Sequence, residues 1–144
     1  MATSDTPLGG GIILIGDGFE EGPAIDCLHA LRDAGAETSL VGLTAGLVTG
    51  SRGIVVQPDL SLDRVMRDAL PRLIVIGGGG RCLNVLLVDP RVHRLVRATS
   101  QSGGRIAILI AAADDARRAL RVPVIVKGSL PVREFVQRLL RMSS

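Results

Sequence analysis

The stretch SGGRIAILIAAADDARR, residues 102–118, decides the fold class because it joins a buried strand to the start of a helix. Its residues RIAILI form a short, almost wholly apolar run, as in a central strand covered on both faces. Three alanines then form a tight bend, and Asp114 and Asp115 follow in the first helical turn, where carboxylates offset the helix dipole. In many α/β enzymes such a bend carries the nucleophile, whereas Ile110 and Ala111 have no reactive atom.

The same alternation of strand and helix extends along the chain in both directions. Pro23 suits the first turn of a helix, and Gly35 suits the position just after its end. Alternation of this kind predicts an α/β fold with a doubly wound, mainly parallel sheet and helices on both faces. We expect one domain over residues 1–144, with 1–10 as a flexible N-terminal tail. The predicted strands are 11–16, 37–43, 72–80, 105–110 and 122–128, the predicted helices are 23–35, 61–70, 89–104, 112–120 and 129–141, and 45–60 is predicted as a strand–turn–strand excursion.

Composition and charge exclude several classes of function. The net charge is only +3, and the basic residues are scattered along the chain. The two aromatic residues, Phe19 and Phe135, are too few for a surface that stacks nucleic-acid bases, so no nucleic-acid partner is expected. No apolar run approaches the ~20 residues of a membrane span, and Met1–Leu8 lacks the features of a signal peptide. The two cysteines form no disulfide framework, which favours a cytoplasmic location.

Several ordered phrases of the sequence resemble the ThiJ/PfpI superfamily. The resemblance extends from Ile12 to about Leu140 and implies a flavodoxin-like fold, in agreement with the pattern above. The superfamily includes the Parkinson-disease-associated deglycase, PfpI-type peptidases and the related class I glutamine amidotransferase domains. The phrases are IGDGFEEGPAIDCLHALRDAGAETSLVGL, SRGIVVQPDLSLDRV, LIVIGGGG, DPRVHRLV and VIVKGSLPVREFVQRLL.

The resemblance also implies where a family active site would lie. Ile110 stands at the place of the nucleophilic cysteine, and Ala111 stands where some members have a histidine. Pro23 stands at the place of the glutamate that holds the thiol's proton or stabilises the thiolate. The segment that would supply a further polar group is reduced to about 119–121. The glycine-rich turn that provides oxyanion donors survives as Gly77–Gly80, with glycine first where proline is usual.

Loss of all three reactive elements predicts a catalytically degenerate domain with a structural, regulatory or assembly role. A thiolate needs a base or charge partner, and an oxyanion hole without a nucleophile has no intermediate to stabilise. The segment reduced to about 119–121 would also cover part of the bend in the family. Its loss is expected to expose the apolar face 122–126, which would then be buried in a homodimer or larger homo-oligomer. The predicted vestigial pocket comprises Glu20, Pro23, Gly77, Gly78, Gly79, Ile110 and Ala111.

An enzyme with a displaced nucleophile is the alternative. Cys82 follows the glycine turn, near an expected helix N-terminus, where the pKa of a thiol can fall. The chain would then be a small-molecule hydrolase, or an enzyme similar to a glyoxalase or deglycase. Against this, Cys82 has no histidine or lysine neighbour in sequence, and a buried packing role explains it as well.

The remaining polar candidates predict no cofactor and no metal ion. Cys27 and His93 suit packing or surface positions on helices, and Glu21 suits an exposed loop. Lys127 would need a pocket for Schiff-base chemistry. Arg81 could meet a phosphate, but GDGFEEG and GGGGRC both lack a complete phosphate-binding motif.

Overall fold

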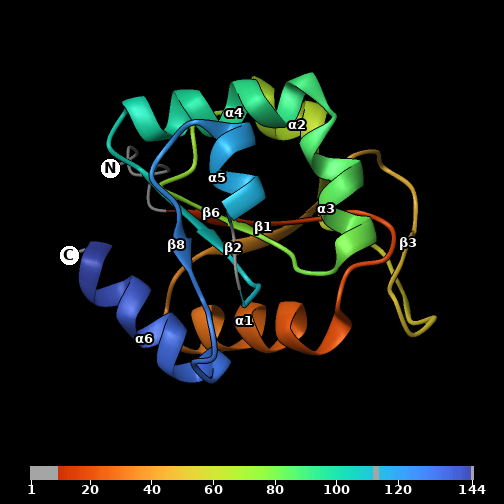
Figure 1. Cartoon of the computed structure of the whole chain (residues 1–144), viewed down its shortest axis with the longest axis horizontal. Coiled ribbons are helices and arrows are strands. Elements are labelled where there is room, and N and C mark those ends of the chain that lie inside the picture. The colour runs from red at the N-terminus through yellow and green to blue at the C-terminus, as the bar shows by residue number, and fades with distance from the viewer. Residues whose placement is uncertain (1–9, 112–113, 144) are drawn as a thin grey trace.

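A six-stranded parallel sheet forms the centre of the molecule in the computed structural model, which describes residues 10–111 and 114–143 (Figure 1). The strand order is β5-β2-β1-β6-β7-β8, and every neighbouring pair is parallel. From β1 the chain therefore first adds β2 and β5 on one side, and then returns to add β6, β7 and β8 on the other side. The strands are β1 (Gly11–Ile15), β2 (Thr38–Gly42), β5 (Leu60–Ser61), β6 (Leu73–Ile76), β7 (Arg105–Ile108) and β8 (Ile125–Val126).

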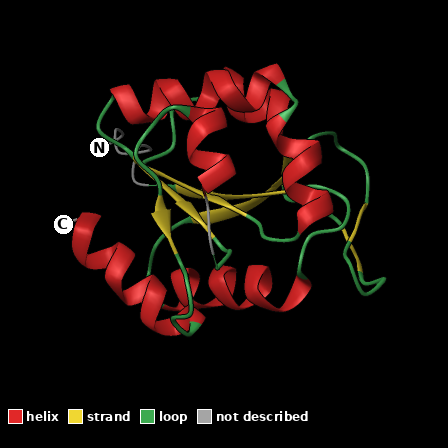
Figure 2. Cartoon of the chain, in the orientation of Figure 1, coloured by secondary structure: helices red, strands yellow, loops and turns green. Residues whose placement is uncertain are grey.

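Helices cover both faces of this sheet, which confirms the predicted doubly wound, flavodoxin-like α/β class. Figure 2 shows helices below the sheet and further helices above it. The lower pair, α1 and α6, pack against each other, and α4 packs against α2, α3 and α5 on the opposite face. The helices are α1 (Glu21–Asp33), α2 (Leu62–Arg67), α3 (Gly80–Leu87), α4 (Pro90–Gln101), α5 (Asp114–Leu120) and α6 (Val132–Ser143).

Burial on both faces explains why the central strands are so apolar. Every residue of β1 and of β6 is buried, as expected for parallel strands between two helical layers. The chain's two aromatic side chains, Phe19 and Phe135, are both fully buried. Both aromatics therefore belong to the core, and neither is available at the surface for stacking.

A small antiparallel hairpin projects beside the main sheet. It consists of β3 (Val48–Thr49) and β4 (Val55–Val56) and corresponds to the excursion predicted at 45–60. The last residue of that range, Leu60, instead begins β5 at the edge of the main sheet.

Capping interactions confirm several predicted helix ends. Ser61 accepts a hydrogen bond from the Arg64 N–H at the start of α2, and Asp89 caps α4 immediately before Pro90. Gly35 follows α1 with a φ of +88°, a conformation that glycine adopts without a steric penalty. Within α5, Asp114 and Asp115 pair with Arg117 and Arg118 one turn later, as expected of carboxylates on an exposed helix surface.

The sequence reading missed or misplaced a few elements. Helix α3 was expected only as a helix N-terminus near Cys82, without bounds, because its first residue belongs to a run of four glycines that suggests a turn. Strand β8 has two residues instead of seven, because only Ile125 and Val126 pair with β7. Of the predicted flexible tail, residues 1–9 lie outside the described residues. Gly10 belongs to the folded part, since its carbonyl accepts a hydrogen bond from the Arg72 N–H.

Arg121 occupies an unfavourable backbone conformation just after α5. Its φ is +57°, in the left-handed region, and it is the one non-glycine residue with positive φ in the described part of the chain. A side chain at such a position costs about 1–2 kcal/mol, whereas glycine costs almost nothing.

We expect Arg121→Gly to raise the free energy of unfolding by about 0.5–1 kcal/mol, the entropy of the more flexible unfolded chain offsetting part of the gain. Urea unfolding followed by circular dichroism measures the change. Arg117→Gly, inside α5, is the control and should destabilise by about 1 kcal/mol. Equal destabilisation by both changes would contradict the role of backbone strain at Arg121.

Candidate functional site

The carboxyl ends of β1, β6 and β7 meet at one edge of the sheet, where the chain reverses its winding direction. This is the edge at which open α/β sheets bind ligands. Three segments follow these strands: the loop 16–20, the glycine turn 77–80 and the bend at 109–111. The Glu20 N–H donates to the Gly78 carbonyl over 3.1 Å, which joins the first two segments.

The glycine turn is close-packed on both of its neighbours. A Cβ atom on Gly78 would lie 2.4 Å from the Leu109 carbonyl oxygen and 2.7 Å from Oε1 of Glu20. Gly79 has a φ of +107°, and a Cβ there would lie 2.5 Å from the Gly18 carbonyl oxygen. Both positions therefore require glycine, and the predicted pocket residues Glu20, Gly78 and Ile110 are brought together around this turn.

Ile110 occupies the bend itself and provides only methyl groups. Its side chain is half-buried, with Cγ2 3.2 Å from the position of a Cβ on Gly78, and its carbonyl accepts from the Gly128 N–H. Ala111 beside it is exposed. Pro23 is half-buried in the first turn of α1 and offers neither a charge nor a proton. As a result, these three positions supply no group able to attack a carbonyl.

Little chain is available to cover this edge from the far side. Helix α5 ends at Leu120 and β8 begins at Ile125, so four residues connect them. The amino group of Lys127, just beyond β8, donates to the carbonyls of Gly128 and Leu130. Because both hydrogen bonds stay within its own loop, the amino group of Lys127 stabilises that loop.

Cys82 lies below the glycine turn and is fully buried. Its Sγ accepts a hydrogen bond from the Gly16 N–H at 3.4 Å, and the thiol donates to the Gly77 carbonyl at 3.7 Å. Burial raises the pKa of the Cys82 thiol to about 11; the Gly16 N–H opposes this rise, while the carboxylates of Asp17 and Glu20 add to it. A thiol in this setting is protonated at neutral pH and inaccessible to a substrate.

Glu21 has a structural role that the sequence analysis missed. It lies in the first turn of α1 and is buried, rather than in an exposed loop. Its Oε2 accepts from the N–H groups of Arg52 and Ile54 at 2.9 and 3.1 Å, and its Oε1 accepts from the Ser51 hydroxyl at 3.3 Å. Gly50 leaves room for this carboxylate, since a Cβ there would lie 2.2 Å from Glu21 Cδ. The Glu21 side chain therefore holds the β3–β4 hairpin against α1 through these hydrogen bonds.

Opposing effects set the ionisation of Glu21. Burial raises its pKa, but the hydrogen bonds from its own N–H, from Arg52, Ile54 and Ser51 outweigh that effect and leave the pKa below its ordinary value of 4.5. The carboxylate is thus charged, and accepts these hydrogen bonds, at neutral pH. The only signals for this role in the sequence are a glutamate at a helix start and Gly50, twenty-nine residues later.

The other candidates have ordinary structural roles. Cys27 is buried within α1, and burial raises its pKa to about 12. Nε2 of His93 lies 2.7 Å from the Leu87 carbonyl, which links α4 to the end of α3. The aliphatic part of Arg81 packs against Gly18. Over residues 10–111 and 114–143, no three side chains of the metal-binding types come together, and no helix is both long and apolar enough to cross a bilayer.

The winding of the sheet, the glycine turn and the bend after β7 define the class as a doubly wound α/β protein with its site at the carboxyl edge. The model of the DJ-1/PfpI family matches residues 12–116, and the chain belongs to that family. This confirms the resemblance seen in the sequence.

Curated relatives agree with the family assignment. A deglycase of Thermococcus kodakarensis is 28% identical over 96 residues, which cover 67% of this chain and 57% of the relative. Protein dj-1beta of Drosophila melanogaster is 32% identical over 102 residues, which cover 70% of this chain and 54% of the relative. The chain thus spans about half the length of these two relatives.

Solved structures show the same fold. An oxidized DJ-1 of Toxoplasma gondii superposes with a TM-score of 0.79 at 19% identity, covering 92% of this chain and 89% of that one. Drosophila melanogaster DJ-1beta superposes with a TM-score of 0.73 at 29% identity, covering 78% of this chain and 60% of that one.

Proposed function

We propose that this chain is a catalytically degenerate DJ-1/PfpI domain that acts in the cytoplasm as a structural, regulatory or assembly subunit. The observation that carries the proposal is Ile110 at the bend where the family resemblance places the nucleophilic cysteine. Pro23 at the glutamate position and the short connection from α5 to β8 support it. The fold itself requires the glycine turn, because Gly78 and Gly79 have no room for a side chain. This requirement explains why the turn is present in a domain without catalytic activity.

Enzymatic activity through Cys82 is the second candidate. It is favoured by the relatives described as deglycases and by the nearness of Cys82 to the glycine turn. The burial of the thiol and its raised pKa argue against it, because at pH 8 only on the order of one thiol in a thousand would be ionised.

Thiol alkylation separates the two functions. We expect iodoacetamide at pH 8 to leave Cys82 and Cys27 of the native protein unmodified, and to modify both once the protein is unfolded in guanidinium. Mass spectrometry identifies the modified residues, and the same native sample is assayed for turnover of methylglyoxal. Selective, fast modification of Cys82 together with turnover would establish the enzyme and refute the degenerate domain.

We further propose that the chain assembles as a homodimer through the surface formed by α1 and the β3–β4 hairpin. Six large apolar side chains are exposed in the described part of the chain, and four of them lie on or next to these two elements. The four are Ile25, Leu47, Ile54 and Val55. A groove of about 450 Å³ continues this surface along α1 between Ile25 and Asp33. Exposed apolar side chains gathered in this way are typical of an interaction surface.

The apolar face expected at 122–126 contributes less than the sequence suggested. Val124 is buried, and Val122, Ile125 and Val126 are half-buried. These side chains pack against the main core even without a cover segment. The region is therefore a weaker candidate for the interface than the hairpin.

We expect Val55→Glu to weaken dimerisation at least about tenfold, because it would place two like charges in a desolvated interface. Light scattering over a micromolar concentration series measures the effect. Val88→Glu is the matched control, since Val88 is 78% exposed but lies at the end of α3. A monomeric parent protein, or equal weakening by both changes, would contradict this interface.

A further inference from the structure

A second concave site lies at the amino ends of the strands, at the edge of the sheet opposite the glycine turn. It has a volume of about 550 Å³, within the range of small-molecule sites. Gly10 and Gly11 enter β1 there, Thr38 begins β2, and Pro71 precedes β6. Because a five-residue strand spans on the order of 15 Å, this cavity is separate from the candidate site described above.

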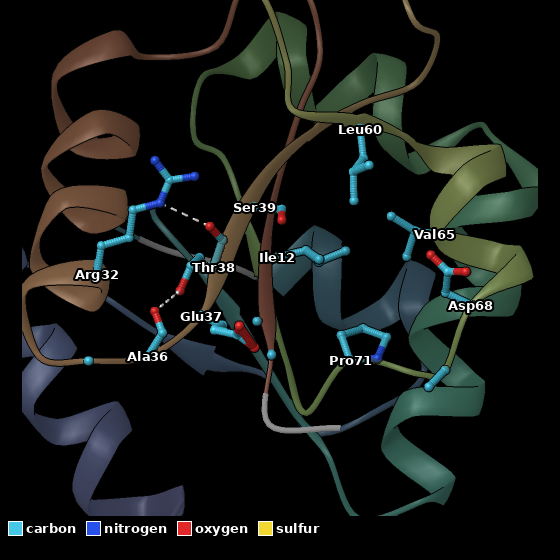
Figure 3. A pocket seen from close by; sticks show the side chains of 14 residues that line it. Ile12, Arg32, Ala36, Glu37, Thr38, Ser39, Leu60, Val65, Asp68 and Pro71 are labelled. Carbon is cyan, nitrogen blue, oxygen red and sulfur yellow. Dashed lines mark hydrogen bonds between the residues drawn. The ribbon is translucent and has the colours of Figure 1, made fainter. Parts of the chain in front are cut away.

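The floor of the cavity is apolar. Ile12 lies at its centre (Figure 3) and is only 5% exposed, as is Val65 of α2. Leu60 and Pro71 complete this surface from β5 and from the segment before β6. A compact hydrocarbon group placed here would be removed from water without displacing any core side chain.

The rim of the cavity carries an excess of negative charge. In Figure 3, Glu37 and Asp68 lie on opposite sides of Ile12. Within the described part of the chain, the Glu37 side chain has no hydrogen bond or ion pair. The Asp68 carboxylate lies 3.7 Å from Nε of Arg64. Both side chains are exposed, so this ion pair contributes little to stability.

Among the described residues that line the cavity, Arg32 is the one cation, and it already has an acidic partner. Arg32 donates from Nε to the Thr38 carbonyl at 3.0 Å and from a terminal nitrogen to Asp59 at 2.9 Å. Its guanidinium therefore pairs with Asp59, and it forms no ion pair with Glu37 or Asp68. The Ser39 side chain also lines the cavity; it is half-buried and adds a hydroxyl that can donate or accept a hydrogen bond.

We propose that this amino-edge cavity binds a small organic amine, with its cationic ammonium group at the acidic rim that Glu37 and Asp68 form and a compact apolar body on Ile12, Leu60 and Val65. Charge complementarity at the rim selects the cation, and the apolar floor selects against small, fully hydrated ions. The site is independent of any chemistry at the glycine turn, and it goes beyond the subunit role proposed above.

Titration of the full chain with three probes of the same shape tests this site. Cyclohexylamine is cationic, cyclohexanol is neutral and cyclohexanecarboxylate is anionic at neutral pH. We expect cyclohexylamine to bind most tightly and the carboxylate least, with the amide NMR signals of Gly10, Gly11, Ser39 and Ala69 shifting. Glu37→Gln and Asp68→Asn should each weaken binding of the amine about two- to fivefold.

Glu134→Gln on α6 is the control, since it removes an exposed acid that does not line the cavity, and it should leave binding unchanged. Equal binding of the three probes would refute the charge selection. Shifts confined to other residues, or no binding of cyclohexylamine, would refute the site.

Discussion

Glu21→Ala is expected to free the β3–β4 hairpin from α1 and, with it, to weaken the proposed dimer. The change removes the acceptor of three hydrogen bonds and leaves the N–H groups of Arg52 and Ile54 without partners. Amide hydrogen exchange at these two residues should accelerate on the order of tenfold, because the hairpin would open without global unfolding. Light scattering should show a larger monomer fraction, since Ile54 and Val55 would no longer be held in position.

Glu20→Ala is the matched control for this prediction. Glu20 immediately precedes α1, but its side chain makes no capping hydrogen bond, and the hairpin does not contact it through any described hydrogen bond. It should therefore leave exchange in the hairpin unchanged. If Glu21→Ala also left exchange unchanged, the carboxylate would not be what holds the hairpin.

Acid should reproduce the effect of the Glu21 substitution. The pKa of Glu21 is lower in the folded protein than its ordinary value, so the carboxylate stabilises the fold fully above that value. The stabilisation is lost as the pH falls below 4.5 and through the lower folded pKa. Glu21→Gln, whose amide cannot ionise, should show a smaller loss of hairpin protection over this acidic range.

Ile110→Cys is expected to produce no measurable turnover of methylglyoxal. The new thiol would lie close to Glu20, because both side chains flank the glycine turn at Gly78. A neighbouring carboxylate raises the pKa of a thiol, and no histidine or lysine follows at Ala111 to oppose it. When the nucleophile lacks a general base or charge partner, the rate of the reaction is lower by a factor on the order of 10²–10⁴.

The double variant Ile110→Cys with Pro23→Glu is the stricter case. It adds back the glutamate that the family resemblance places at this position, and it can yield a reactive thiol. We expect it to remain without robust turnover, because only four residues connect α5 to β8 and little chain covers the edge. Ile110→Val controls for disturbance of the bend. Robust turnover by the single cysteine variant would overturn the degenerate-domain proposal.

Local patterns were sufficient to predict the class of fold. An apolar run such as 105–110 can be satisfied only by burial on both faces, and alternation with amphipathic helices leaves few arrangements besides a parallel sheet. The helix starts predicted at 61 and 89 and the helix end predicted at Gly35 are confirmed, because capping depends on residues adjacent in sequence. The absence of a thiol at Ile110 was likewise visible in the sequence, once the family resemblance aligned the bend.

Contacts between distant segments could not be predicted in this way. Nothing near Glu21 in sequence indicates that its carboxylate holds residues 51–54, since those N–H groups approach it only after α1 and the hairpin pack together. The burial of Cys82 and its high pKa arise from the surrounding β1 and β6 turns. The amino-edge cavity unites Glu37 and Asp68, thirty-one residues apart, around Ile12. Sequence patterns thus determined which elements form and which reactive groups are missing, whereas tertiary packing decided the environment of each polar group, because burial and electrostatics depend on every segment that surrounds it.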